Sequence, residues 1–339
     1  MNVAVDAMGG DHAPDVVVQG ALQAAERWGI GITLVGNKDV LKDRIGCPLD
    51  GAPFKVYHCE GAVSMEDRPF KSVKENKDAS IRVAFELCKR GEAAAVVSAG
   101  NSGATIAAGI LTLGRINGIE RPALPGIFPG ERGTVILIDV GANVDCRPIH
   151  LFQFGAMAHG LAISCLGIRD PKIALLSIGE EGSKGNEQVR VAHDLFKRSG
   201  LNFVGNVEGS DLFSGPADII VCDGFVGNIV LKMSEGIADA LSVIIGEELK
   251  GSFAAEIGAR LTERVRERLK KKLDYAEYGG GAPILGINGV GIVCHGGSSA
   301  RAIRNAIRMA DAYARLNIQK RLSSHMREQR VAGIGLKKP

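Results

Sequence analysis

The chain of 339 residues is 45% hydrophobic and 23% charged, a composition typical of soluble globular proteins. At this length a folded domain buries roughly three quarters of the surface that its unfolded chain exposes, so neither disulfides nor a metal is needed to hold it together. The seven cysteines form no CxxC pair. Such a set fits a reducing cytosol, where cysteine packs as a small hydrophobe. Because Asp6 and Asp11 interrupt the first apolar stretch, no signal peptide is expected.

The net charge of +3 hides an asymmetry along the chain. Eight Lys/Arg and three Glu lie in 250–272, and seven Lys/Arg and one Glu lie in 312–339. Two uncharged windows, 93–114 and 148–168, are as long as a membrane span. Turn residues and histidines interrupt them, so we expect buried segments of a soluble fold. The basic stretches favour an acidic partner, and nothing indicates nucleic acid.

Short β-like apolar runs recur along the chain, and most end at glycine or a small polar residue before a helix-like segment. The predicted strands are 2–7, 31–35, 54–59, 93–97, 134–138, 172–177, 218–222 and 289–294. The predicted helices are 15–28, 104–115, 151–166, 189–198, 229–248 and 300–316.

Continuous apolar strands that alternate with helices predict a mostly parallel sheet covered on both faces, a three-layer α/β/α fold. We expect 1–248 and 276–320 to form a single α/β catalytic domain. A helical insertion over 249–275 and a basic C-terminal tail over 321–339 complete the predicted organisation. In such a sheet, ligands bind beyond the carboxyl ends of the strands.

Polar, glycine-rich turns follow several of the predicted strands. The turn AGNSG contains Asn101, Ser102 and Gly103, which we expect to bind an anion at a helix N-terminus. An ordinary helix cap is an equal alternative for this turn. The turn EEGSKGNE places Gly182 beside Lys184, a lysine suited to phosphate or thioester oxygen. It would equally suit a solvated loop.

Three further turns add candidates at the same edge. DGFVGN supplies Asp223 and Asn228, DVGANVD supplies Asn143, and HGGSS supplies His295 and Ser298. A single histidine at a strand end is more often structural than catalytic. Together, the five turns on one rim favour a binding site over five unrelated caps.

Several other chemistries have no support in the sequence. It has no Walker A lysine motif, no GxSxG elbow and no HExxH pair, and its first strand lacks GxGxxG. The Cys–His spacing fits no zinc site. Acidic residues at strand ends could hold Mg²⁺, but no pair demands it, and no metal site is predicted.

The insertion 249–275 carries an apolar stripe that includes Ile257, Leu261 and Val265, flanked by Arg264 and Arg268. A basic amphipathic helix of this kind fits a membrane surface or an acidic protein. Packing of the stripe against a dimer partner is the alternative.

The motifs VAVDAMGGDHAP (3–14), SAGNSGAT (98–105), DVGANVD, IGEEGSKGNE, CDGFVGN and HGGSS resemble those of the bacterial PlsX family of phosphate acyltransferases, from residue 1 to about 318. The resemblance implies transfer of a fatty acyl group from acyl carrier protein to inorganic phosphate, for phospholipid synthesis. It implies a phosphotransacetylase-like or isocitrate-dehydrogenase-like fold and no redox cofactor. It also implies a homodimer in the cytoplasm that attaches loosely to the membrane and hands its product to a membrane-bound glycerol-3-phosphate acyltransferase.

This chemistry needs an anion site, donors for the developing oxyanion and room for an acyl chain. We expect Lys184 and Asn228 to be the oxyanion donors, and phosphate to attack the thioester directly. Three alternatives remain open: a short-chain phosphotransacetylase acting on acyl-CoA, a nicotinamide-dependent decarboxylating dehydrogenase, and a non-catalytic membrane scaffold for lipid enzymes.

Overall fold

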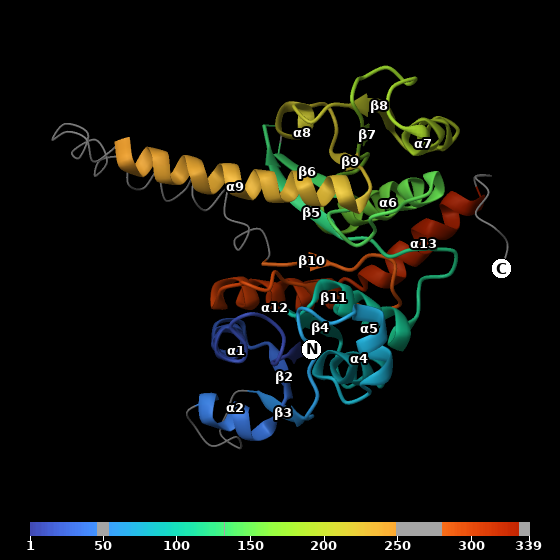
Figure 1. Ribbon diagram of the computed structural model, residues 1–339. Helices are drawn as coiled ribbons and strands as arrows, with labels where there is room; N and C mark the ends of the chain where they lie inside the picture. The colour runs from blue at the N-terminus through green and yellow to red at the C-terminus, as the bar shows by residue number, and fades with distance from the viewer. Residues whose placement is uncertain (46–53, 132, 249–279, 332–339) are drawn as a thin grey trace.

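Two sheets carry the fold of this protein (Figure 1). The computed structural model describes residues 1–45, 54–131, 133–248 and 280–331. The predicted α/β class is confirmed, but the strands are divided between two sheets where the sequence predicts one. The predicted insertion 249–275 lies outside the described residues.

The first sheet has six strands and the second has five. All pairings within them are parallel except β10–β11 and β5–β6. In spatial order the first sheet contains β10 (Ala282–Pro283), β11 (Gly291–Val293), β4 (Ala95–Ser98), β1 (Asn2–Asp6), β2 (Gly31–Gly36) and β3 (Lys55–His58). The second contains β5 (Pro125–Gly130), β6 (Gly133–Ile138), β9 (Ile219–Val221), β7 (Ile173–Leu176) and β8 (Phe203–Val207).

Helices cover both faces of each sheet. The helices before the second sheet are α1 (Asp15–Trp28), α2 (Lys38–Ile45), α3 (Pro69–Glu75), α4 (Ser80–Lys89) and α5 (Ser102–Leu113). The later ones are α6 (Pro148–Leu161), continued by a π-helical turn over Ala162–Leu166, then α7 (Glu187–Lys197), α8 (Asp211–Ser214), α9 (Gly224–Glu248), α12 (Ala300–Arg315) and α13 (Ile318–Val331).

The apolar composition of the strands follows from this covering. Successive side chains of a strand point to opposite faces of its sheet. Val3 and Val5 of β1 pack in the cluster that contains α1 and α12, whereas Ala4 between them packs in the cluster that contains α4 and α5. A strand covered on both faces has no polar face, so its sequence is a continuous apolar run.

The apolar helix α6 lies in the core. Every residue from His150 to Leu161 is buried. By length and composition alone, Pro148–Leu166 could cross a membrane, but 72% of this segment is buried inside the protein. This burial agrees with the prediction of a core segment.

The end of the described chain differs from the prediction of a tail over 321–339. Residues up to Val331 belong to α13, which packs on α6. Leu322 and Met326 of this helix are buried. The tail prediction is therefore wrong for 321–331, because two apolar side chains one turn apart give α13 a face to bury. Residues 332–339 lie outside the described part of the chain.

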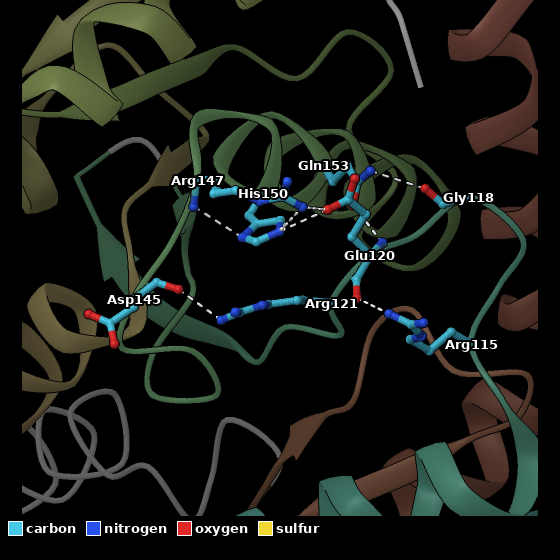
Figure 2. Close-up of polar contacts among 8 residues, drawn as sticks. All are labelled: Arg115, Gly118, Glu120, Arg121, Asp145, Arg147, His150 and Gln153. Atoms are coloured by element: carbon cyan, nitrogen blue, oxygen red, sulfur yellow. Dashed lines mark hydrogen bonds and ion pairs between the residues drawn. The ribbon is translucent and has the colours of Figure 1, made fainter. Parts of the chain in front are cut away.

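A polar junction holds the segment that passes from α5 of the first sheet to β5 of the second (Figure 2). The Gln153 amide, fully buried on α6, donates to the carbonyl oxygen of Gly118 over 3.0 Å and accepts from the backbone N–H of Glu120 over 2.9 Å. The Glu120 carboxylate forms an ion pair with Arg147 and lies 3.1 Å from Nε2 of His150. Since buried polar groups must find partners, these contacts fix the path of the connecting segment.

A pair of stacked histidines joins α6 to α13. His159 Nδ1 lies 3.2 Å from His325 Nε2. Burial lowers the pKa of His159 to about 4 and also lowers the pKa of His325. A group with a depressed folded-state pKa stabilises the fold above its unfolded pKa of about 6.5, and this contribution is lost as the pH falls towards the folded value.

We therefore expect the melting temperature to fall between pH 7 and pH 5, and the double variant His159→Gln, His325→Gln to show a smaller fall. Thermal unfolding followed by circular dichroism measures this, with the exposed His12→Gln as the control. An equal pH dependence in the double variant and the parent protein would contradict the assignment.

Candidate active site

A pocket of about 130 Å³ lies between the two sheets, where carboxyl ends of strands from both converge. Ser102 begins α5 after β4, and His295 follows β11 of the same sheet. Asn228, in the first turn of α9 after β9, comes from the second sheet. The structure thus brings together three of the predicted site residues, from segments distant in the sequence. The remaining lining is Leu124, Pro125, Gly126, Ile127, Val140, Leu231, Lys232, Gly281, Ala282, Val293 and Cys294.

A buried aspartate shapes the pocket on the side of the second sheet. Asp139, fully buried after β6, accepts hydrogen bonds from the backbone N–H groups of Leu124 (3.0 Å), Ala142 (3.0 Å) and Asn143 (2.7 Å). Burial raises the pKa of this carboxyl above its ordinary value, although these donors act in the opposite direction. The Asp139 contacts fix the turn beside Leu124 and Val140, which line the pocket.

Asp6 has a comparable place at the end of β1. Its carboxylate accepts hydrogen bonds from the hydroxyls of Ser80 (2.6 Å) and Ser98 (2.7 Å). Burial raises the pKa of Asp6. A Cβ on Gly9 would stand 2.5 Å from the Asp6 carboxylate and 2.8 Å from the backbone nitrogen of Gly100. Only glycine therefore fits where the loops after β1 and β4 cross.

The predicted anion-binding turn is an N-terminal cap of α5. Asn101 Oδ1 accepts from the backbone N–H of Ala104 over 3.0 Å, and Asn101 Nδ2 donates to the carbonyl oxygen of Met65. A Cβ on Gly103 would stand 2.7 Å from Pro69 of α3, so this glycine permits close packing. Of the three residues, Ser102 lines the pocket. The amides of the first turn of a helix lack intrahelical acceptors, so Ser102 still presents the start of α5 to the pocket.

Lys184 and Gly182 lie in the loop after β7, outside the lining of this pocket. The Lys184 side chain is exposed, and its backbone N–H donates to the carbonyl oxygen of Glu181 over 2.9 Å. Because β7 is the neighbour of β9, the loop starts from the same sheet edge as Asn228. A Cβ on Gly182 would stand 2.8 Å from the buried His193 ring, so the loop packs closely there.

Asn143 and Asp223 have structural contacts. Asn143 Nδ2 donates to the carbonyl oxygen of Pro122 (2.7 Å) and to Asp139 (2.9 Å). Asp223 accepts from the backbone N–H of Val226 (2.9 Å) at the start of α9 and from the side chain of Gln188 (2.6 Å). Both side chains have their acceptors or donors satisfied within the fold, and neither lines the pocket.

The turn after β11 contains the other two predicted residues. The backbone N–H of Gly297 donates to His295 Nδ1 over 3.1 Å. This contact leaves Nε2 as the protonated nitrogen of a neutral ring, a hydrogen-bond donor. Ser298 is buried, and its hydroxyl has no partner among the described residues. His295 lines the pocket and Ser298 does not.

Lys232 is the pocket residue that the sequence interpretation missed. It lies one helical turn after Asn228 on α9, and its Nζ is 2.8 Å from Glu235 Oε2. Residues four apart share a face of a helix. The signal in the sequence was its position four residues after Asn228, whereas the residues predicted for this site all came from turns or the first turn of a helix.

The thiols of the described cysteines are poor nucleophiles. Burial raises the pKa of Cys294, which lines the pocket, to about 12, and raises the pKa of Cys222 well above its ordinary value. A reactive cysteine needs the thiolate. We expect the double variant Cys222→Ser, Cys294→Ser to keep most of the activity in a turnover assay. An acyl group trapped on either position of the parent protein would overturn this expectation and, with it, direct attack by phosphate.

The structure shows no group of three or more His, Cys, Asp or Glu side chains arranged to hold a metal ion within the ranges it describes.

Comparison with known proteins identifies relatives of this chain. The model of a family described as "Fatty acid synthesis protein" matches residues 1–321. A phosphate acyltransferase of Geotalea daltonii is 51% identical over 333 residues, which cover 97% of this chain and 95% of that protein. A phosphate acyltransferase of Geobacter sulfurreducens is 49% identical over 333 residues, which cover 98% and 96%.

Solved structures share the fold at low sequence identity. A branched-chain phosphotransacylase from Enterococcus faecalis superposes with a TM-score of 0.59 at 15% identity and covers 93% of this chain and 99% of its own. The EutD phosphotransacetylase from Staphylococcus aureus superposes with a TM-score of 0.56 at 15% identity, over 93% and 94%.

Proposed function

The chain belongs to the family of phosphate acyltransferases, and we propose that its acyl donor is a fatty acyl thioester of acyl carrier protein. Membership confirms the resemblance seen in the motifs and makes this protein an acyltransferase that uses phosphate. The dehydrogenase and scaffold alternatives are set aside by this family assignment.

The observation that carries the proposal is the mixed lining of the pocket. Ser102, Asn228 and His295 supply polar groups, and the strands β5, β10 and β11 supply apolar walls. A thioester carbonyl and a phosphate need hydrogen-bond donors, whereas an acyl chain needs an apolar surface. Both requirements meet in one cavity.

The proposed reaction is a direct acyl transfer. A phosphate oxygen attacks the thioester carbon, the carbon–sulfur bond breaks, and the carrier thiolate leaves and takes up a proton. The products are acyl phosphate and the free carrier thiol. Hydrogen-bond donors such as Asn228 and Lys184 stabilise the oxyanion that forms between these steps. We propose that an acyltransferase of glycerol-3-phosphate at the membrane then consumes the acyl phosphate in phospholipid synthesis.

The partners proposed for the protein are a second copy of the chain and the membrane surface. Helix α9 projects from the body (Figure 1) and exposes Phe225, Ile229, Met233, Ile237 and Leu241 at intervals of four residues. An exposed apolar stripe of this length supports the proposal that a partner surface covers this face of α9. The basic insertion 249–275 remains the proposed contact for the membrane or the carrier protein, in a homodimer that is cytoplasmic and peripherally bound.

The test is phosphate-dependent release of free thiol from acyl carrier protein, with the acyl product trapped by hydroxylamine. We expect release to require phosphate, and kcat/KM to be higher with the acyl carrier protein than with acyl-CoA. Higher kcat/KM with acyl-CoA would favour a short-chain phosphotransacetylase. Equal thiol release without phosphate would contradict the proposal.

A further inference from the structure

Lys232 is the one permanently charged side chain in the lining of the pocket as the structure describes it. It lies on α9 close to Asn228 and Leu231 of the same helix, which also line the pocket. A lysine one helical turn beyond Asn228 is well placed to contact the same ligand.

The Lys232 ammonium is held by an exchangeable partner. Its Nζ lies 2.8 Å from the carboxylate of Glu235, and the two side chains are 45% and 34% exposed. Ion pairs at such exposure contribute little to stability, so a competing anion can displace the carboxylate at little cost. The ion pair therefore orients the Lys232 side chain, and its ammonium group can still bind another anion.

The opposite wall of the pocket also favours an anion. Ser102 stands at the start of α5, a helix of twelve residues whose first-turn amides and dipole attract negative charge. His295 adds a ring N–H donor from the turn after β11. An anion in the pocket would therefore meet positive groups from both sheets.

We propose that Lys232 binds the phosphate group, first as the attacking substrate and then as the phosphoryl end of the product, and that phosphate displaces Glu235 from it. This proposal rests on the transfer of acyl groups to phosphate and does not depend on the identity of the thioester. Lys232 is a substrate-binding residue in this account, and Glu235 is its counter-ion in the empty enzyme.

Substitutions of Lys232 and of Glu235 are expected to change the KM for phosphate in opposite directions. Lys232→Met keeps the apolar stem but removes the charge, and we expect the KM for phosphate to rise about tenfold or more, the scale of one lost charge-assisted hydrogen bond. Glu235→Gln removes the competing carboxylate, and we expect the KM for phosphate to fall. Lys232→Arg keeps the charge and is expected to restore most of the affinity.

Two measurements make the test independent of the acyl donor. Calorimetric titration of the enzyme with inorganic phosphate alone follows the binding step, and turnover at varied phosphate gives KM and kcat separately. Lys197→Met on the exposed surface of α7 is the matched control. If acyl carrier protein is the wrong donor, the calorimetric affinities still change as stated.

Unchanged phosphate affinity in a folded Lys232→Met protein would overturn the proposal. A loss of affinity in Glu235→Gln equal to that in Lys232→Met would also overturn it, because the pair would then be a structural contact. Should Lys232→Met fail to fold, Glu235→Gln and Lys232→Arg decide the question by the same affinities.

Discussion

Replacing Lys184 by alanine is expected to lower turnover by about two orders of magnitude, the loss found when one donor to a developing oxyanion is removed. The lysine is exposed in the loop after β7, beside the strand that leads to Asn228. Because its side chain has no hydrogen bond or ion pair among the described residues, its removal leaves the fold intact. The measurement is kcat for phosphate-dependent thiol release, with the melting temperature recorded for the same preparation.

Lys172→Ala is the matched control for this experiment. Lys172 precedes β7 and Lys184 follows it, so the two lysines lie at opposite ends of one strand. We expect the Lys172 variant to keep the activity of the parent enzyme. Full activity in Lys184→Ala, with unchanged melting behaviour, would remove Lys184 from the mechanism.

Asp139→Ala is expected to cost roughly 3 kcal/mol or more of the free energy of unfolding. The substitution leaves the backbone N–H groups of Leu124, Ala142 and Asn143 without their acceptor, and each buried unsatisfied donor costs about 1–3 kcal/mol. Urea denaturation gives the loss as a lower midpoint at an unchanged slope.

Asp145 lies in the same turn with an exposed side chain, and provides the comparison. We expect Asp145→Ala to change the free energy of unfolding by no more than about 0.5 kcal/mol, as for most surface substitutions. A stability for Asp139→Ala close to that of Asp145→Ala would mean that the buried carboxylate does not hold the turn together.

Most of the strands that could be predicted from the sequence are buried, although the exposed edge strand β3 was also predicted. β1, β4, β6 and β9 are continuous apolar runs, which the pattern identifies directly. The three strands that the pattern did not predict, β5, β8 and β10, are all at sheet edges. β5 contains two prolines, which an edge strand accepts because its outer N–H groups need no partner.

The division of the strands into two sheets could not be predicted from the sequence pattern either. Nothing in a β-branched run states which other run it pairs with, since pairing depends on contacts between distant residues. In the order β5–β6–β9–β7–β8, α6 contacts β6 and β9, and α7 contacts β7 and β8.

The candidate site was predictable where it lies in turns. Ser102, Asn228 and His295 each follow a strand, and their shared edge brings them to one pocket. Lys232 is inside a helix, where polar residues are usually solvated, so composition gave no reason to select it. Asn101 and Asn143 have the polar character of site residues but cap a helix and a turn, and sequence alone does not separate these uses.

The position of β5 at the margin of its sheet has a consequence for how this enzyme can diversify. Leu124, Pro125 and Ile127 form part of the apolar wall of the pocket, and β5 has β6 as its neighbouring strand. Ile127 is half-buried, so a change in its side-chain volume disturbs less of the core than a change at the buried Leu124. The groups that we propose to bind phosphate lie on other elements, namely α5, α9 and the turn after β11. We therefore expect substitutions in β5 to change which acyl groups the pocket accepts, while the proposed phosphate contacts are retained.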